Sequence, residues 1–165
     1  MFAALLENRP SALQRLSGLF GRHGHNIDSL TVSPTGDEGI SRVTWTADVG
    51  DKADSLVRQL RTLHGVVAVQ ILEPERSQAR ELWMVKVRSG RLEDVLRRLG
   101  ATRLSTGPVD IWTVVVESGQ KRAVREELAT PDVVEWTSTG VVALSTEEEG
   151  LKPERIEMQR GGAWS

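Results

Sequence analysis

The chain has 165 residues, of which 39% are hydrophobic and 27% charged, a composition typical of a soluble globular protein with one ordinary domain or two small ones. Its 21 basic and 23 acidic residues give a formal net charge of -2, so no overall positive field favours nucleic acid or an anionic membrane. Cysteine is absent, which excludes disulfides, thiolate metal sites and a cysteine nucleophile, and agrees with a reducing compartment.

The first half of the chain predicts strands and helices in the order βαββαβ. Residues 2–7 form a short apolar strand. A helix starts at Pro10, which suits the first helical position, and ends before Gly24, where a positive φ is tolerated. Two strands follow around a turn at residues 34–39, and after a second helix the strand at residues 66–72 completes the unit.

A similar order begins again after a charged stretch that contains proline, residues 74–80, which we interpret as a linker. Residues 81–87 form a strand, and a helix with a leucine stripe follows. Residues 102–106 give a weak strand pattern and residues 111–117 a clear one. A short helix and further strands up to residue 145 complete the second unit.

The sequence therefore predicts an α+β protein of two tandem ferredoxin-like βαββαβ units, each an antiparallel sheet with helices on one face. We place the N-terminal domain at residues 1–73, the linker at 74–80 and the C-terminal domain at 81–145. Residues 146–165 are polar, and we expect a tail that is disordered unless a partner orders it. Because each sheet leaves one face or edge free, we also expect a dimer.

Two asparagines flank the first predicted helix and are candidates for binding a free amino acid. A helix start at Pro10 leaves the N–H groups of Ser11 and Ala12 without intrahelical acceptors, at the positive end of the helix dipole, where a carboxylate can bind. In a βαβ arrangement Asn8 and Asn26 can converge near the same mouth and bind both ends of an amino acid. The alternative is structural: Asn8 caps the helix and Asn26 takes the turn after it.

Several short motifs occur in a fixed order between residues 5 and 44. They are an LLEN strand, a small residue before AL, a helix ending in GLF, then G-x-NI-x-SL-x-V-x-PT, and SR in the third strand. They occupy Leu5 to Asn8, Ala12 and Leu13, Gly18 to Phe20, Gly24 to Ile27, Ser29 to Val32, Pro34 and Thr35, and Ser41 and Arg42. This order closely resembles the N-terminal ACT domain of the regulatory small subunit of acetohydroxyacid synthase, also called acetolactate synthase. Looser similarity in RELWMVKV and VVEWTSTGVVALS extends the resemblance, with an ACT-like second domain, over most of residues 1–145.

The resemblance implies a noncatalytic regulatory subunit that activates the catalytic large subunit in the synthesis of valine, leucine and isoleucine. It implies no cofactor in this chain, and thiamine diphosphate, Mg and FAD in the catalytic partner. In this family a branched-chain amino acid lies between the two ACT domains of a homodimer. The residues of this chain that match the effector-binding positions are Asn8, Pro10, Ser11, Ala12, Asn26 and Ile27.

The chain departs from the family pattern at Ser11, where the family usually has a glycine that lets the backbone approach the ligand. The serine side chain can crowd the amino acid, or its hydroxyl can add a hydrogen bond. If the φ angle there is positive, serine costs roughly 1 to 2 kcal/mol of strain. Because one methylene changes binding in an apolar pocket only modestly, valine, leucine and isoleucine all remain candidate effectors. A second departure is the stretch of residues 90–108, which looks shorter than in the family.

Other chemical functions are not indicated. His23 and His25 lack a third ligand nearby in the sequence, so we expect no metal site. There is no G-x-S-x-G elbow and no phosphate-binding glycine loop, so we expect no catalytic residues. RNA recognition by such a sheet needs paired aromatic residues and a basic surface, whereas this chain has no tyrosine and two phenylalanines.

The N-terminus lacks the basic start and long apolar core of a signal peptide, and no apolar run approaches the roughly 20 residues that span a bilayer. We therefore expect a cytoplasmic protein without a membrane or nucleic-acid partner. The remaining alternative function is a stand-alone tandem-ACT amino-acid sensor that regulates a different partner.

Overall fold

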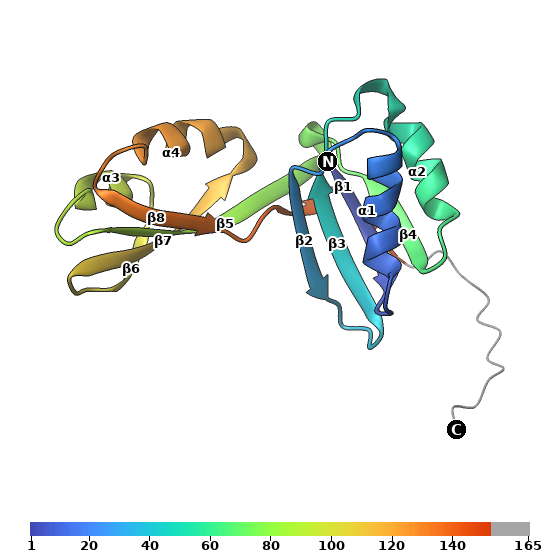
Figure 1. The fold of residues 1–165 in the computed structure, drawn as a ribbon, viewed down its shortest axis with the longest axis horizontal. Coiled ribbons are helices and arrows are strands. Elements are labelled where there is room, and N and C mark those ends of the chain that lie inside the picture. Colours follow the sequence, from blue (N-terminus) through green and yellow to red (C-terminus); the bar gives the residue numbers. More distant parts are fainter. Residues whose placement is uncertain (153–165) are drawn as a thin grey trace.

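A computed structural model describes residues 1–152, which form two α+β units joined through one long strand (Figure 1). The first unit contains β1 (Phe2–Glu7), α1 (Ala12–Arg22), β2 (Ser29–Pro34), β3 (Ile40–Thr46), η1 (Gly50–Lys52), α2 (Ala53–Arg61) and β4 (Val66–Ile71). The rest of the chain contains η2 (Pro74–Arg76), β5 (Ser77–Arg88), α3 (Glu93–Arg98), β6 (Thr102–Ser105), β7 (Val109–Glu117), η3 (Ser118–Gln120), α4 (Lys121–Glu127), β8 (Val133–Ser138) and β9 (Val142–Ser145). The predicted α+β fold with two βαββαβ units is confirmed.

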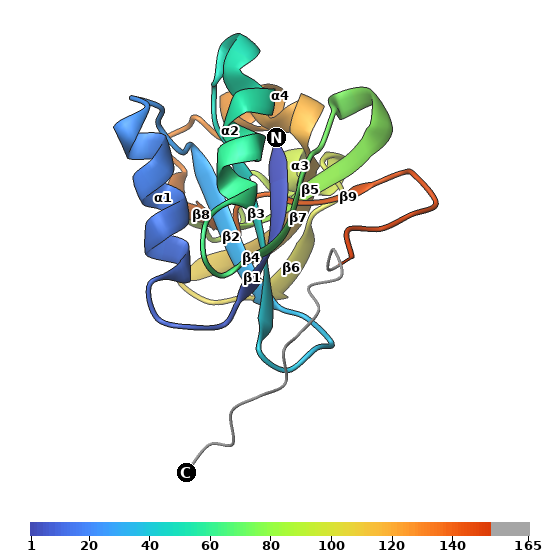
Figure 2. The same ribbon diagram turned by 90° about the vertical axis from the view of Figure 1, so that its right-hand side faces the viewer.

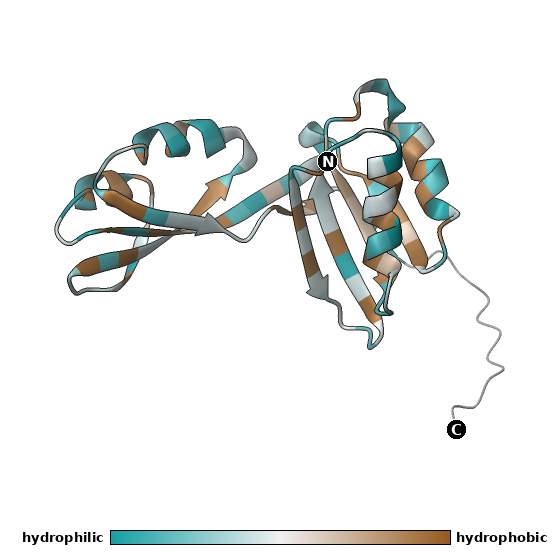
Figure 3. Ribbon diagram, in the orientation of Figure 1, coloured by the Kyte–Doolittle hydropathy of each residue, from teal (hydrophilic) through white to brown (hydrophobic). Residues whose placement is uncertain are grey.

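The strands of the first unit form an antiparallel sheet in the order β2-β3-β1-β4, and α1 and α2 both lie on one of its faces (Figures 1 and 2). β1 lies inside the sheet and is buried on both faces, because its residues are apolar without alternation. Phe2 and Leu6 point to the helices, whereas Ala3 and Leu5 pack on the opposite side. β2 alternates hydrophobic and polar segments (Figure 3) and forms one edge.

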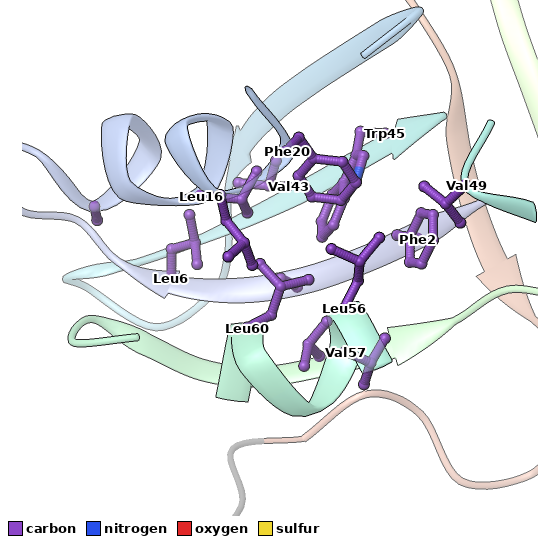
Figure 4. Packing of buried hydrophobic residues seen from close by; sticks show 14 residues of the cluster. Phe2, Leu6, Leu16, Phe20, Val43, Trp45, Val49, Leu56, Val57 and Leu60 are labelled. Carbon is purple, nitrogen blue, oxygen red and sulfur yellow. The ribbon is translucent and has the colours of Figure 1, made fainter. Parts of the chain in front are cut away.

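An aromatic cluster fixes α1 against this sheet (Figure 4). Phe2 and Trp45 stack with their ring centroids 5.4 Å apart, and Phe20 of α1 meets them edge-on at 6.0 and 5.8 Å. Leu56 and Leu60 extend the same core from α2. Because aromatic pairs of this geometry bury large areas, the C-terminal end of α1 is held firmly on the sheet.

The second unit repeats this architecture. Its sheet has the order β6-β7-β5-β8, and α3 and α4 lie on one face (Figure 1). Trp83 and Trp112 are buried in the core beneath these helices. Alternate residues of β5 and β7 point to the other face, where Leu82, Met84 and Val115 are exposed.

Part of the predicted linker is a strand. Ser77 to Arg80 are the first residues of β5, and they pair antiparallel with β9, from Ser77 opposite Ser145 to Arg80 opposite Val142. Ser77 and Ala79 are buried. Because both are small residues in a charged stretch, hydrophobicity alone did not indicate a strand. β5 therefore runs without interruption from the first unit into the second.

The beginning of the predicted tail is also tied to the fold. The Thr146 N–H donates to the Arg76 carbonyl at 2.9 Å, and the Arg76 side chain forms an ion pair with Glu147. Leu151 packs against the outer face of the first sheet. The remaining residues 153–165, which include Trp164, lie outside the described residues.

Candidate functional site

Helix α1 starts without a side chain that caps it. Ser11 is its N-cap residue, with φ +70° and ψ -5°, and makes no side-chain hydrogen bond to the first turn. Pro10 lies in the preceding turn and not at the first helical position, because the left-handed Ser11 separates it from the helix. The first turn contains no acidic residue. The Ala12 N–H donates to the Arg9 carbonyl at 3.3 Å and is not free. The N–H groups that follow it have no carboxylate of their own turn, a setting in which a helix start attracts an anion.

Two neighbouring loops hold the connection between β1 and α1 in place. The Glu7 N–H donates to the Gly65 carbonyl at 2.8 Å, and the Asn8 N–H donates to the Gly39 carbonyl at 2.6 Å. Gly65 has φ +87°, and a Cβ there would lie 3.5 Å from the Cβ of Ala12. The geometry of the helix start is thus fixed by contacts distant in sequence.

Within one chain, Asn8 and Asn26 do not meet. Glu7, just before Asn8, pairs with Ile40, whereas Ser29, soon after Asn26, pairs with Thr46 at the other end of β3. The 11 residues of α1 separate the two asparagines by about 16 Å of helix. The prediction that they converge at one mouth of a single chain is therefore wrong, because the helix carries the chain back along the whole sheet.

The side chains of the candidate residues fall into two groups. Asn8, Pro10 and Ser11 are exposed at the start of α1, beside the buried Ala12. Because Ser11 is the N-cap residue, the alternative in which Asn8 caps α1 is wrong.

The second group lies after the end of α1. Asn26 is exposed, and its Nδ2 donates to Asp28 Oδ1 at 3.3 Å. Ile27 is partly buried against the core of the first unit. The two groups thus present separate surfaces at the two ends of one helix.

The positive φ of Ser11 predicts that Ser11→Gly stabilises the protein. Glycine adopts this conformation without the steric cost of a Cβ, and its greater freedom in the unfolded chain offsets part of the gain, so we expect about 0.5 to 1 kcal/mol in the free energy of unfolding. Urea denaturation measures this change. Ser17→Gly in the same helix is the matched control and should destabilise by roughly the same amount. Destabilisation by both substitutions would show that Ser11 is not strained.

His23 and His64 make other hydrogen bonds. His23 Nε2 lies 2.9 Å from Gln59 Oε1, and the His64 carbonyl accepts a hydrogen bond from Arg15 at 3.4 Å. Within residues 1–152, no group of three His, Asp or Glu side chains is arranged to hold a metal ion. In the same part of the chain, no helix combines the length and apolar character needed to cross a bilayer.

A partly buried ion pair lies near the junction of the two units and was not identified from the sequence. Glu81 is 5% exposed, accepts a hydrogen bond from Trp83 Nε1 at 2.9 Å and pairs with Lys121 of α4. Trp136 stacks on Trp83 at 4.6 Å, and Arg125 lies over Trp136. The spacing of Glu81 and Trp83 along β5 could have indicated that the carboxylate is buried beside the tryptophan, since alternate strand residues share a face.

Known proteins resemble this chain over nearly its whole length. The family described as "AHAS small subunit-like ACT domain" matches residues 2–68. The acetolactate synthase isozyme 3 small subunit of Escherichia coli is 35% identical over 156 residues, covering 88% of this chain and 94% of that protein. The acetolactate synthase small subunit of Mycolicibacterium smegmatis is 28% identical over 156 residues, covering 90% and 92%.

A solved structure shares the arrangement of both units. The acetolactate synthase small subunit from Thermotoga maritima superimposes with a TM-score of 0.77 at 24% identity, over 87% of this chain and 94% of that chain. At this identity the similarity supports the fold, and the sequence relatives supply the assignment. This chain belongs to the family of acetolactate synthase small subunits.

Proposed function

We propose that this chain binds the catalytic large subunit of acetolactate synthase, increases its rate of acetolactate formation and makes it sensitive to a branched-chain amino acid. The observation that carries the proposal is the 35% identity to a named small subunit over 94% of that protein's length. The chain is a regulatory subunit, so the chemistry belongs to the large subunit, where we expect thiamine diphosphate, Mg and FAD. We expect the two subunits to act together in the cytoplasm.

The free edge of β2 supports a dimer formed through the ACT domains. β2 is the outermost strand of its sheet, so one side of its backbone has no neighbouring strand within the described residues. Leu30 and Val32 on this strand are 37% and 48% exposed. Antiparallel pairing of β2 with β2 of a second copy satisfies these backbone groups and extends the sheet across a twofold axis.

This pairing also completes the candidate site. In two antiparallel β2 strands, the Ser29 end of one lies beside the Pro34 end of the other. Asn26 precedes the Ser29 end, and the Asn8 N–H is bonded to Gly39 near the Pro34 end. Each dimer therefore has two sites. Each combines the helix start of one subunit with the α1–β2 connection of its partner: Asn8, Pro10, Ser11 and Ala12 with Asn26 and Ile27.

The chemistry of this composite site suits a free amino acid. The N–H groups that follow Ala12 in the first turn of α1 bind the carboxylate, and an asparagine side-chain oxygen accepts from the ammonium group. Burial of a branched apolar side chain adds about 1.5 to 3 kcal/mol, which discriminates against small polar amino acids. Ser11 narrows the approach to the helix start, so Ser11→Gly is expected to bind the effector at least as tightly as the natural chain.

Reconstitution with the large subunit of the same organism tests this function. We expect the two chains to elute together in size-exclusion chromatography and acetolactate formation per large subunit to rise with added chain. Valine, leucine or isoleucine should then lower the rate. No complex and no rate change would contradict the proposal. A different stable partner in copurification from cells would favour the tandem-ACT sensor instead.

A further inference from the structure

The connection between β8 and β9 lies directly against β2 of the first unit. The Thr31 Oγ1 hydroxyl donates to the Thr139 carbonyl at 3.0 Å. The Val141 N–H donates to Ser29 Oγ at 3.1 Å, and the Val141 side chain is fully buried against the outer face of the first sheet. Residues 139–141 thus join the second unit to the strand that follows Asn26 and Ile27.

Gly140 makes this contact possible. Its φ is +75°, and a Cβ there would lie 2.7 Å from Thr31 Oγ1 and 3.2 Å from Ser29 Oγ. A contact of 2.7 Å is too short for a carbon atom and an oxygen atom that are not bonded. Both the backbone conformation and the space therefore require glycine at this position.

The connection is held on its other side as well. The Thr139 N–H donates to the Leu82 carbonyl at 3.0 Å, and the Leu82 N–H donates back to Thr139 Oγ1 at 3.2 Å. Farther along, the Arg42 guanidinium donates to the Ala143 carbonyl at 2.9 Å, and burial lowers the pKa of this guanidinium. Contacts with both units leave the connection little freedom to move independently of either.

The joint between residues 139–141 and β2 lies next to one half of the candidate effector site. A hollow of about 410 Å³ between the units is lined by Asp28 and Ser29 of the first unit and by Trp136 and Gly140 of the second. Asp28 accepts the hydrogen bond from the Asn26 side chain. Ser29 lies only three positions after Asn26 and is bonded to Val141. A displacement at Asn26 is therefore transmitted to residues 139–141 through Ser29.

We propose that Ser29, Thr31 and Gly140 are positioning residues that couple amino-acid binding in the ACT domain to the orientation of the second unit. The coupling rests on the proposed function, whereas the rigidity of the joint does not. When the effector draws Asn26 toward the partner subunit, the start of β2 moves with it. Because the joint is packed without room for a methyl group at Gly140, the second unit follows.

Distance measurements between spin labels test the joint directly. The natural chain has no cysteine, so single cysteines introduced at Gln14 on α1 and Arg122 on α4 label the two units specifically. We expect a narrow distance distribution for the otherwise natural chain and a broadened or shifted one for Gly140→Ala. Gly100→Ala is the matched control, because Gly100 also has φ +75° but nothing lies within 4 Å of the added Cβ. Equal, narrow distributions for all three proteins would overturn the proposal.

The reconstituted complex tests the coupling. Valine, leucine and isoleucine are each titrated by calorimetry and in the acetolactate assay. We expect Gly140→Ala to bind the effector within about twofold of the natural chain but to keep less than about half of the maximal inhibition at saturating effector, with Gly100→Ala unchanged in both. Full inhibition in Gly140→Ala would overturn the coupling. A natural chain that binds none of the three amino acids would refute the effector role and the coupling together, while the spin-label distances would still decide whether the joint is rigid.

Discussion

Replacing Asn26 with alanine is expected to raise the concentration of branched-chain amino acid needed for half-maximal inhibition by about 10- to 100-fold. A hydrogen bond to a charged group contributes about 1.5 to 3 kcal/mol, which corresponds to this change in affinity. Asn26 is exposed and bonds to the exposed Asp28, so its loss leaves the core of the first unit intact. Titration of the inhibitor in the acetolactate assay measures the shift, and stimulation of the large subunit should persist.

Asp28→Ala is the control for Asn26→Ala. It removes the carboxylate that accepts from Asn26 but leaves the amide itself in place. We expect a shift of no more than about threefold, since only the orientation of the amide is lost. If Asn26→Ala abolished stimulation together with inhibition, a role in folding would replace the proposed role in binding.

Lys121→Met is expected to lower the free energy of unfolding by about 2 to 3 kcal/mol. The substitution leaves the Glu81 carboxylate buried with one remaining hydrogen bond from Trp83, and removing one partner of a buried ion pair is strongly destabilising. The Lys121 side chain is 29% exposed, so water screens part of the pair and the loss should fall below that of a fully buried pair. Urea denaturation followed by tryptophan fluorescence measures the change.

Two further variants isolate the ion pair. Arg122→Met removes the neighbouring charge, whose side chain is 92% exposed, and should change stability by less than about 0.5 kcal/mol. Combining Lys121→Met with Glu81→Leu should recover most of the loss, because an apolar pair replaces the lone buried charge. Equal losses in Lys121→Met and Arg122→Met would show that burial of Glu81 does not determine the effect.

The sequence predicted the elements well because most of them are specified locally. Periodicity identified both βαββαβ units, and even the weak pattern at residues 102–106 corresponds to β6, Thr102–Ser105. Ser77 to Arg80 were missed because their pairing with β9 involves residues more than 60 positions away. Small buried residues that depend on such a partner carry little hydrophobic signal of their own.

The residues of the candidate site stay a prediction, and their arrangement within one chain could not be predicted from the sequence. The family resemblance pointed to the start of α1. Serine was expected to be strained there if its φ angle were positive, and the φ angle of Ser11 is +70°. The expected βαβ arrangement suggested that Asn8 and Asn26 can converge, whereas α1 places them at opposite ends of the sheet. Nothing local in the sequence indicates the role of Gly140, since the reason for a glycine there is Thr31, 109 positions earlier in the chain and in the other unit.

Valine, leucine or isoleucine binding to mixed dimers tests most directly whether two subunits share the site. Asn8→Ala and Asn26→Ala chains with different affinity tags are coexpressed, and the mixed dimers are purified by both tags. One site of each mixed dimer then carries both substitutions and the other carries neither. We expect mixed dimers to regain about half of the natural binding capacity while each parental dimer binds weakly. Mixed dimers that bind as weakly as both parental dimers would place the site within one subunit and contradict a site shared by two subunits.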